Sequence, residues 1–363
     1  MRLFNTTVTP EGKQLVNESL ESTFISAGKM ADKFEEELKP WIGNAVTVNS
    51  GTASLHLALE AADVRGGEVI LPAQTFIASG LAIIHAGAKP VFADINYMTG
   101  NIDPKSIVSK ITDNTKAIMV VHWGGNPCDM DEIGQIAKEY DLVVIEDAAH
   151  AFGTTYKGRK IGEISDFTCF SFQAIKHLTT GDGGAVCALT NENVKKLKKL
   201  RWFNIDREDD KPDILGERAY NSNEVGYKYH MNDIAASLGV GNLKSIDGKL
   251  AKHRYIANLY YRPELGHVDG ITLFDKQDDR NSADWLFGFH VERREDFIRM
   301  MKSNNIPTSV IHLGIDKNDL FGGLDETLVN QRKFDKTQIH IPCHDGLNGE
   351  EITRIISTIK RGW

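Results

Sequence analysis

Lys176 is the residue whose surroundings in the sequence point most directly to covalent chemistry. Apolar Ala174 and Ile175 come just before it, and a glycine-rich turn follows at 181–184. A lysine in a dry site loses part of its hydration, which lowers its pKa and frees the amine to form a Schiff base with a carbonyl compound. The alternative is that Lys176 is simply a solvated lysine, one of 42 basic residues. If this stretch were the only evidence, that alternative would be favoured, so other stretches must decide whether Lys176 is a nucleophile.

Asp147 follows the very apolar run 142–145, with Glu146 between them. A buried carboxylate needs a cationic partner, and a protonated pyridine nitrogen would serve as one. Asp147 would then keep such a ring able to take up electrons. The alternative is an aspartate that caps the next helix. His150 either contacts the ring oxygen or is a structural histidine whose hydrogen bonds are satisfied. No other His, Cys or carboxylate is grouped with Asp147 and His150, so no metal site is expected.

The stretch Asn-Ser-Gly-Thr at 49–52 joins an expected strand to the start of a helix. A helix N-terminus offers free N–H groups and partial positive charge, so it holds phosphate well. Gly51 lets the backbone approach closely, Thr52 adds a hydroxyl, and Ser171 could donate to the same phosphate. The alternative is an ordinary Ser/Thr N-cap. Neither G-x-x-x-x-G-K-[ST] nor G-x-G-x-x-G occurs, so nucleotide loops of these kinds are not expected.

The elements that must position these residues alternate between strand and helix. After helices at 11–23 and 31–39, strands are expected at 45–49, 68–71, 91–93, 117–121, 142–145, 167–172 and 185–189, and helices at 52–62, 76–86, 104–110 and 130–139. Such alternation predicts an α/β fold with a mostly parallel sheet covered on both faces, and the last pair of strands adds an antiparallel one. Ligands bind at the carboxyl ends of such strands, where all three stretches lie.

The second half of the chain changes character. The polar segment 204–230 is interpreted as a long surface excursion. Beyond it, strands are expected at 285–291, 307–312 and 337–341, and helices at 295–303 and 349–360. Because 363 residues favour two domains, we predict a large α/β domain at 1–244 and a smaller α+β domain at 245–363.

Composition narrows the classes of partner. A net charge of -8 argues against a nucleic-acid partner. The four cysteines form no C-x-x-C pair, which indicates reduced core thiols and a cytoplasmic protein. No apolar run approaches 18 residues and the N-terminus lacks an apolar signal region, so neither a membrane span nor a signal peptide is expected.

A phosphate cradle, a carboxylate for a ring nitrogen and a Schiff-base lysine, in that order, are the parts of a pyridoxal 5′-phosphate site. Over almost its whole length the chain resembles the nucleotide-sugar aminotransferases of the DegT/DnrJ/EryC1/StrS type. The resemblance rests on N-S-G-T-A-S-L at 49–55, P-A-Q-T-F at 72–76, G-A-K-P-V-F-A-D-I at 87–95, I-E-D-A-A-H-A-F-G at 145–153, S-F-Q-A-I-K at 171–176, T-G-D-G-G at 180–184 and G-Y-K-Y-H-M-N-D-I at 226–234.

This resemblance implies an aspartate-aminotransferase-type fold, PLP fold type I, and a role at the cofactor for each candidate residue. The implied roles are the Schiff base for Lys176, the pyridine nitrogen for Asp147, the ring hydroxyl for His150, ring stacking for Phe76, and the phosphate for Gly51, Thr52 and Ser171. Many members have Gln at the position of His150. Related sugar 3-dehydratases replace the lysine with histidine, and His177 lies one place too late for that.

The implied reaction moves an amino group from an amino acid, L-glutamate by family likeness, to a nucleotide-linked keto-sugar. The resemblance also implies a homodimer with shared sites, in which 226–230 reaches the neighbour's cofactor phosphate. Lys228 stands there where many members have Asn. Two alternatives stay open. One is another PLP enzyme, either a lyase or a desulfurase, and a desulfurase would need a reactive loop cysteine. The other is a non-catalytic PLP-binding regulator. The sugar, the nucleotide and the aminated carbon are not determined at this level.

Overall fold

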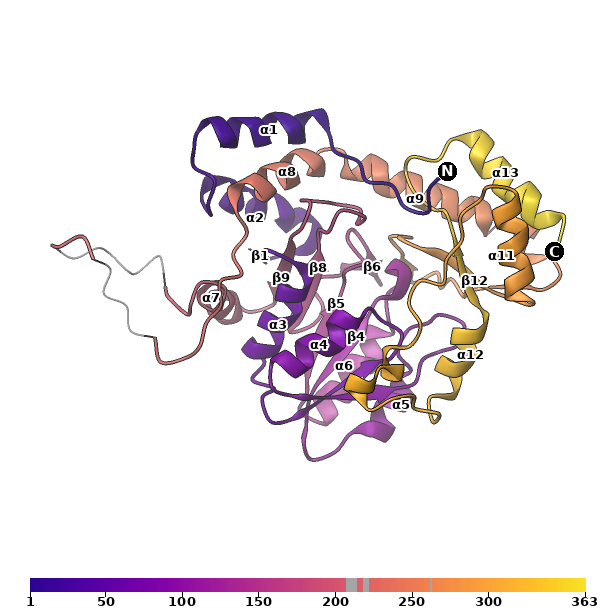
Figure 1. The fold of residues 1–363 in the computed structure, drawn as a ribbon. Coiled ribbons are helices and arrows are strands. Elements are labelled where there is room, and N and C mark those ends of the chain that lie inside the picture. Colours follow the sequence, from indigo (N-terminus) through magenta and orange to yellow (C-terminus); the bar gives the residue numbers. More distant parts are fainter. Residues whose placement is uncertain (207–213, 218–221, 262) are drawn as a thin grey trace.

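A seven-stranded sheet forms the centre of the computed structural model, which describes residues 1–363 except 207–213, 218–221 and 262 (Figure 1). Its order is β1-β9-β8-β5-β4-β2-β3. The strands are β1 (Ala45–Val48), β2 (Glu68–Pro72), β3 (Lys89–Ala93), β4 (Thr115–Val121), β5 (Val143–Asp147), β8 (Phe167–Ser171) and β9 (Gly184–Ala188). Strand β9 runs antiparallel to β8 and β1, whereas β3, β2, β4, β5 and β8 pair in parallel. The predicted, mostly parallel sheet is confirmed.

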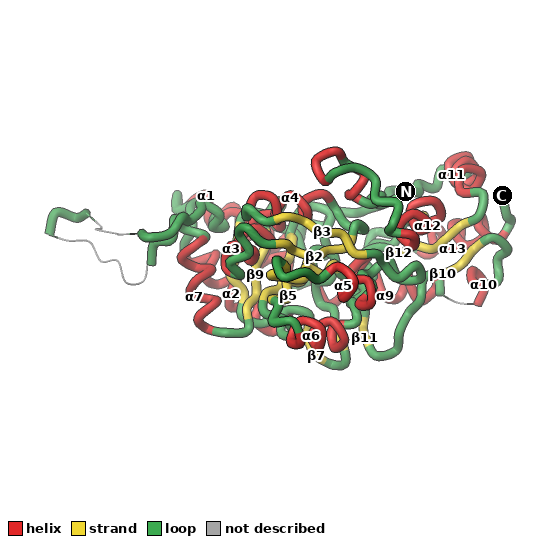
Figure 2. Tube along the Cα trace, turned by 90° about the horizontal axis from the view of Figure 1, so that it is seen from below, coloured by secondary structure: helices red, strands yellow, loops and turns green. Residues whose placement is uncertain are grey.

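Helices cover both faces of this sheet, and Figure 2 shows α4 and α6 on opposite sides of the strands. Neighbouring residues therefore enter different cores: Ile70 packs into one, and Val69 and Leu71 into the other. This double burial explains why the strands are apolar throughout rather than alternating. The helices of the large unit are α1 (Pro10–Glu21), α2 (Lys29–Ile42), α3 (Gly51–Ala61), α4 (Ile77–His85), α5 (Pro104–Lys110), α6 (Met130–Glu139), α7 (Asn191–Leu200) and α8 (Asp233–Leu243).

A smaller sheet of order β10-β12-β13 organises the C-terminal part around a third core. Its strands are β10 (Ile271–Leu273), β12 (Phe287–Val291) and β13 (Gln338–Ile341), and its helices are α9 (Ile246–Tyr260), α10 (Pro263–Gly266), α11 (Arg294–Ser303), α12 (Val329–Thr337) and α13 (Gly349–Lys360). Helix α9 adds Leu250 to a core of the large unit and Tyr260 to the third core. The chain thus passes between cores within one helix, and the division at 244/245 stays a prediction.

The irregular segments hold most of the differences from expectation. The strand expected at 307–312 is wrong: these residues make one isolated bridge, Ser309 to His340, and His312 has a φ of +58°, which breaks an extended strand. A minor sheet of β6 (Thr155–Tyr156), β7 (Arg159–Lys160) and β11 (Arg280–Asn281) was not anticipated, nor were β10 and α12. Part of the polar excursion at 204–230 lies outside the described residues.

Candidate active site

A cavity of about 360 Å³ opens at the carboxyl ends of the parallel strands, next to the starts of α3 and α4. Its volume lies in the usual range for small-molecule sites. It brings together seven of the eight candidate residues: Gly51, Thr52, Phe76, Asp147, His150, Ser171 and Lys176. The C-terminal part contributes Trp285 and His312 to the same wall.

Lys176 lies in the turn after β8, where its backbone N–H donates to the carbonyl of Gln173 at 2.9 Å. Burial lowers the pKa of its amine from 10.5 to about 7, and the nearby negative charge of Asp147 opposes this shift. A large fraction of this amine is therefore uncharged at neutral pH. Lys176 is therefore not a fully solvated lysine, and its role as a nucleophile stays a prediction.

Asp147 is the last residue of β5, and its buried carboxylate reaches the cavity. One oxygen accepts from the Ser79 hydroxyl at 2.8 Å and the other from the Ala149 N–H at 3.1 Å. Burial raises the pKa of this carboxyl despite both bonds. The helix-cap alternative is wrong, because the next element after β5 is the strand β6. A carboxylate held by neutral donors beside an open cavity suits a cationic partner.

The neighbouring acid, Glu146, takes no part in this cavity. Successive side chains of a strand point to opposite faces, and Glu146 pairs with His122 at 2.7 Å within the core. Thr168 donates a second hydrogen bond to Glu146 at 3.0 Å. Both oxygens of Glu146 are thus hydrogen-bonded inside the protein, and Asp147 alone of the two acids faces the cavity.

The start of α3 forms the opposite end of the cavity. Ser50, not Thr52, is the N-cap: its hydroxyl accepts from the Ala53 N–H at 3.1 Å. The Thr52 hydroxyl is therefore not needed for capping. A Cβ atom on Gly51 would lie 2.8 Å from the Cβ of Ser171, so only glycine allows the helix start to approach the end of β8 this closely. The first N–H groups of α3 and the helix dipole suit an anion such as phosphate.

His150 and Phe76 supply flat side chains to the cavity. The His150 ring stacks on Trp285 with a centroid separation of 3.9 Å, and burial holds its pKa well below 6.5. Its Nδ1 atom is buried without a hydrogen-bond partner among the described residues, so it is not a fully satisfied structural histidine. Phe76 precedes α4, is 55% exposed and lies 5.1 Å from the His312 ring. An accessible aromatic face of this kind suits stacking on a flat ring.

Sequence reasoning missed Ser79 and Trp285, and it named His312 only as part of 311–319, a stretch where substrate contacts are plausible but are not assigned to residues. Ser79 lies inside the apolar helix α4, and no motif marks the hydroxyl that reaches Asp147. Trp285 and His312 lie more than 100 residues after Lys176, so only the packing of the C-terminal part reveals them. Burial, with the charge of Lys176, lowers the pKa of His312 to about 4. The sequence signal for His312 is weak, because no motif assigns a role to it.

Lys228 is not among the residues that line this cavity. It forms a backbone bridge with Trp202, and its amine lies 5.9 Å from the centroid of the Trp202 ring. Its predicted role at the cofactor phosphate of a second chain stays a prediction.

The cysteines and the possible metal ligands bear on the alternative functions. All four cysteines are free and buried, as expected. Cys169 lines the cavity, but burial raises the pKa of its thiol well above 9.0, so it is not the reactive thiolate that a desulfurase needs. Across the described residues, no group of three or more His, Cys, Asp or Glu side chains could hold a metal ion. In the same part of the chain, no helix has both the length and the apolar character needed to cross a membrane.

The chain is similar to known proteins over nearly its whole length. Residues 7–360 match the DegT/DnrJ/EryC1/StrS aminotransferase family. GDP-perosamine synthase from Escherichia coli O157:H7 is 39% identical, over 98% of this chain and 97% of the relative. UDP-4-amino-4,6-dideoxy-N-acetyl-beta-L-altrosamine transaminase from Campylobacter jejuni strain 81-176 is 32% identical, over 96% and 95%. The solved PLP form of a putative sugar aminotransferase from Streptococcus pneumoniae has a TM-score of 0.91 at 29% identity, over 99% and 98%. The predicted fold is thereby confirmed.

Proposed function

This chain belongs to the DegT/DnrJ/EryC1/StrS aminotransferase family, a family of PLP-dependent enzymes, and from that premise we propose that it aminates a nucleotide-linked keto-sugar. The amino group would come from an amino acid, which we take to be L-glutamate. The observation that carries the proposal is one cavity lined by a lysine with a lowered pKa, a buried aspartate and a helix start. The two relatives are named for GDP- and UDP-linked sugars, so we leave the nucleotide open.

The cavity residues fit pyridoxal 5′-phosphate by charge and shape. When bound, this group supplies a ring that takes up the electron pair left as a proton leaves the amino donor. We assign the ring nitrogen to Asp147, whose buried carboxylate accepts hydrogen bonds from two neutral donors and faces the open cavity. We assign the phosphate to the start of α3, with Gly51, Thr52 and Ser171 around it. An anion at a helix start and a cation at a buried carboxylate are both favourable pairings.

The remaining residues of the cavity have positioning roles in this proposal. We assign Phe76 to one face of the cofactor ring, because its own ring is exposed at the cavity wall. His150, whose buried Nδ1 has no partner in the described part of the chain, is assigned to the ring hydroxyl. Both assignments follow from the aromatic and hydrogen-bonding character of the side chains.

Lys176 moves the protons of the proposed reaction. It removes the proton from the α-carbon of the donor, and in the second half-reaction it returns one to the sugar carbon that receives the amino group. A pKa of about 7 suits both tasks, because comparable amounts of amine and ammonium are then present near neutral pH.

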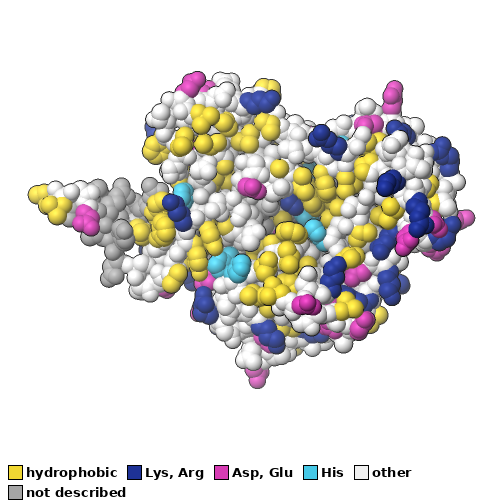
Figure 3. Space-filling view, viewed as in Figure 1, with side chains coloured by type: hydrophobic (Ala, Val, Ile, Leu, Met, Phe, Trp, Pro, Cys, Tyr) yellow, Lys and Arg dark blue, Asp and Glu magenta, His cyan; other side chains and the backbone are white. Residues whose placement is uncertain are grey.

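We further propose that two chains share their active sites. Ile214 and Leu215 are 101% and 82% exposed, and Figure 3 shows apolar side chains at the tip of the projecting segment that carries them. Contact with a second chain would cover these apolar groups. Lys228 follows on the same excursion, and its positive charge suits a phosphate dianion.

The four free cysteines are the reason for placing the protein in the cytoplasm.

One experiment tests the proposed reaction. The PLP-loaded protein is incubated with L-glutamate and a panel of nucleotide-linked 3-keto and 4-keto sugars, and the products are identified by mass. We expect one amino sugar from the parent and none from Lys176→Ala. Borohydride reduction before digestion should leave the cofactor mass on the peptide that contains Lys176. Trapping on another lysine, or turnover by Lys176→Ala near the parent rate, would contradict the proposal.

A further inference from the structure

Trp285 contacts both the amine of Lys176 and the backbone just before it. The Nζ atom of Lys176 lies 3.7 Å from the centroid of the indole ring. The indole Nε1–H donates to the carbonyl of Ile175 at 2.9 Å. One side chain from the C-terminal part of the fold is thus joined to the lysine at two points. These contacts fix the position of the amine relative to its own backbone.

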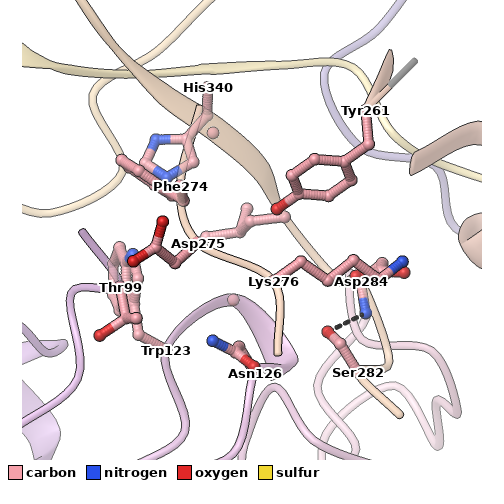
Figure 4. A pocket seen from close by; sticks show the side chains of 13 residues that line it. Thr99, Trp123, Asn126, Tyr261, Phe274, Asp275, Lys276, Ser282, Asp284 and His340 are labelled. Atoms are coloured by element: carbon pink, nitrogen blue, oxygen red, sulfur yellow. Dashed lines mark hydrogen bonds between the residues drawn. The ribbon is translucent and has the colours of Figure 1, made fainter. Parts of the chain in front are cut away.

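Asp284, the residue directly before Trp285, has an unusual backbone conformation. Asp284 has a φ of +50°, in the left-handed region that costs non-glycine residues free energy. Its N–H donates to the Ser282 hydroxyl at 3.0 Å, drawn as a dashed line in Figure 4, and its carbonyl accepts from His253 at 3.1 Å. Asp284 also lines a separate, small cavity of about 40 Å³ (Figure 4). Such a conformation persists where the surroundings determine it.

The indole ring is further held by two aromatic neighbours. His150 stacks on it at 3.9 Å with an interplanar angle of 19°, and Phe4 stacks on it at 5.1 Å with an angle of 23°. Aromatic pairs at these separations are favourable beyond their buried area. The stack therefore links the lysine to the N-terminal segment of the chain.

Phe4 is itself kept in place by its flanking residues. The carbonyl of Arg2 accepts from His344 at 3.0 Å, and the Thr7 hydroxyl donates to Asp345 at 2.8 Å. Asn5 donates to the other oxygen of Asp345 at 3.3 Å. These bonds hold residues 2–7 against the C-terminal part.

The titratable groups around Lys176 line the two cavities to which it contributes. On the cavity side these groups are Asp147 from the end of β5, His150 and His312, and burial lowers the pKa of both histidines. Behind it, a cavity of about 10 Å³ is shared with Trp285. The titratable groups around this rear cavity are His177, Lys249, His253, Cys343, His344 and Asp345. An indole face attracts an ammonium group, and this attraction opposes the effect of burial on the pKa of Lys176.

We propose that Trp285 is a positioning residue, whose indole face holds the amine of Lys176 whenever that amine is not bonded to a carbonyl carbon, and that Phe4 holds the indole. The inference rests on the proposed function, in which Lys176 must be released while the donor is bound. A released lysine that swings freely would lose its alignment with the proton that it moves. The stack keeps the amine within the cavity instead.

The test is the pH profile of Lys176 in the cofactor-free full-length chain. Acetic anhydride labels free amines, and mass spectrometry of the peptide reports labelling of Lys176 at each pH. We expect Trp285→Leu to move the labelling midpoint down by about one pH unit, a tenfold rise in free amine below it. Trp285→Phe keeps a weaker aromatic face, so its shift should be smaller. Trp41→Leu, in the separate stack with Phe152, is the matched control and should not move the midpoint.

Phe4→Leu extends the test to a side chain one contact further from the lysine. It should move the midpoint in the same direction as Trp285→Leu, but by less, because the indole stays present and becomes less fixed. An unchanged or raised midpoint in a cooperatively folded Trp285→Leu would overturn the proposal. If Trp285→Leu does not fold, unchanged midpoints in both Trp285→Phe and Phe4→Leu would overturn it equally. The labelling needs no cofactor, so it can fail while borohydride trapping still supports the proposed function.

Discussion

Asp147 and the adjacent Glu146 differ in the groups that surround their carboxylates. Its hydrogen bonds come from the Ser79 hydroxyl and the Ala149 N–H, while the adjacent Glu146 is paired with His122. Two neighbouring acids are thus given different tasks, one at the cavity and one in the core. Replacing each by its amide should separate the two tasks.

We expect Asp147→Asn to bind PLP but to lose activity by on the order of 10²-fold or more, because a neutral amide cannot keep the ring nitrogen protonated. Glu146→Gln is the matched control. It weakens a buried pair, so it should lower the unfolding free energy while leaving turnover close to that of the parent. Measurements of turnover and of urea unfolding decide this, and an Asp147→Asn enzyme as active as the parent would refute the assignment.

The lowered pKa of Lys176 also predicts how stability depends on pH. Between pH 7 and 10.5 the unfolded chain binds a proton at this lysine more strongly than the folded chain does. The unfolding free energy therefore rises with pH in this window, and the full cost of burial is present below pH 7. The burial that suits Lys176 to its proposed function therefore lowers the stability of the fold.

In the cofactor-free protein, Lys176→Met should be more stable than the parent at pH 7. This advantage should shrink by up to about 1 kcal/mol per pH unit as the pH rises toward 10. Urea unfolding at pH 7, 8 and 9 measures it. Lys302→Met is the control, because Lys302 is exposed and its replacement removes no cost of burying an amine. A difference between Lys176→Met and the parent that does not change with pH would contradict the lowered pKa.

The start of α3 shows how an element positions a site through its backbone. Ser50 caps the helix, and Gly51 packs against Ser171 at the end of β8. The close approach brings N–H groups and a hydroxyl to one place without a dedicated side chain for each bond. The site at this end depends on the separation between a helix and a strand.

Gly51→Ala should therefore raise the dissociation constant for PLP by about tenfold or more, because the added methyl group pushes α3 away from β8. Gly134→Ala in α6 provides the matched control. An added methyl group there would meet no packing neighbour within 4 Å among the described residues, so alanine should be neutral or stabilising. Fluorescence titration of PLP measures both. An unchanged dissociation constant in Gly51→Ala would argue against a phosphate site at this helix.

At the scale of the whole molecule, the question is whether one chain alone forms a complete active site. The cavity of one chain contains Lys176 and Asp147, whereas Lys228 lies apart, beside Trp202. A two-fold dimer would form two equivalent sites, each using Lys228 from the other chain.

Mixing an inactive Lys176→Ala chain with an inactive Lys228→Glu chain should restore activity, because mixed dimers contain one intact site. Random pairing predicts roughly a quarter of the parent activity. Lys176→Ala mixed with Asp147→Asn is the control: both residues belong to the same chain's cavity, so no mixed dimer has an intact site. Absence of recovery with Lys228→Glu, despite proven chain exchange, would show that Lys228 does not act across chains.

Much of the site followed from local patterns. Gly51, Asp147 and Lys176 each lie just after a strand or at its end, and the carboxyl ends of parallel strands share one edge of a sheet. Period-two and helical patterns are local properties of the chain, so the alternation of strands and helices was sufficient to bring these residues together.

The tertiary structure alone decided the remainder. Trp285 and His312 reach the cavity only because the C-terminal part packs beside the large sheet, and no short motif encodes contacts over more than 100 residues. The strand expected at 307–312 is reduced to one isolated bridge at Ser309, and the backbone of His312 is left-handed. The sequence had already assigned the cavity role to Asp147, but only the structure shows what Glu146 does: strand alternation turns it to the other face of the sheet, where it pairs with His122.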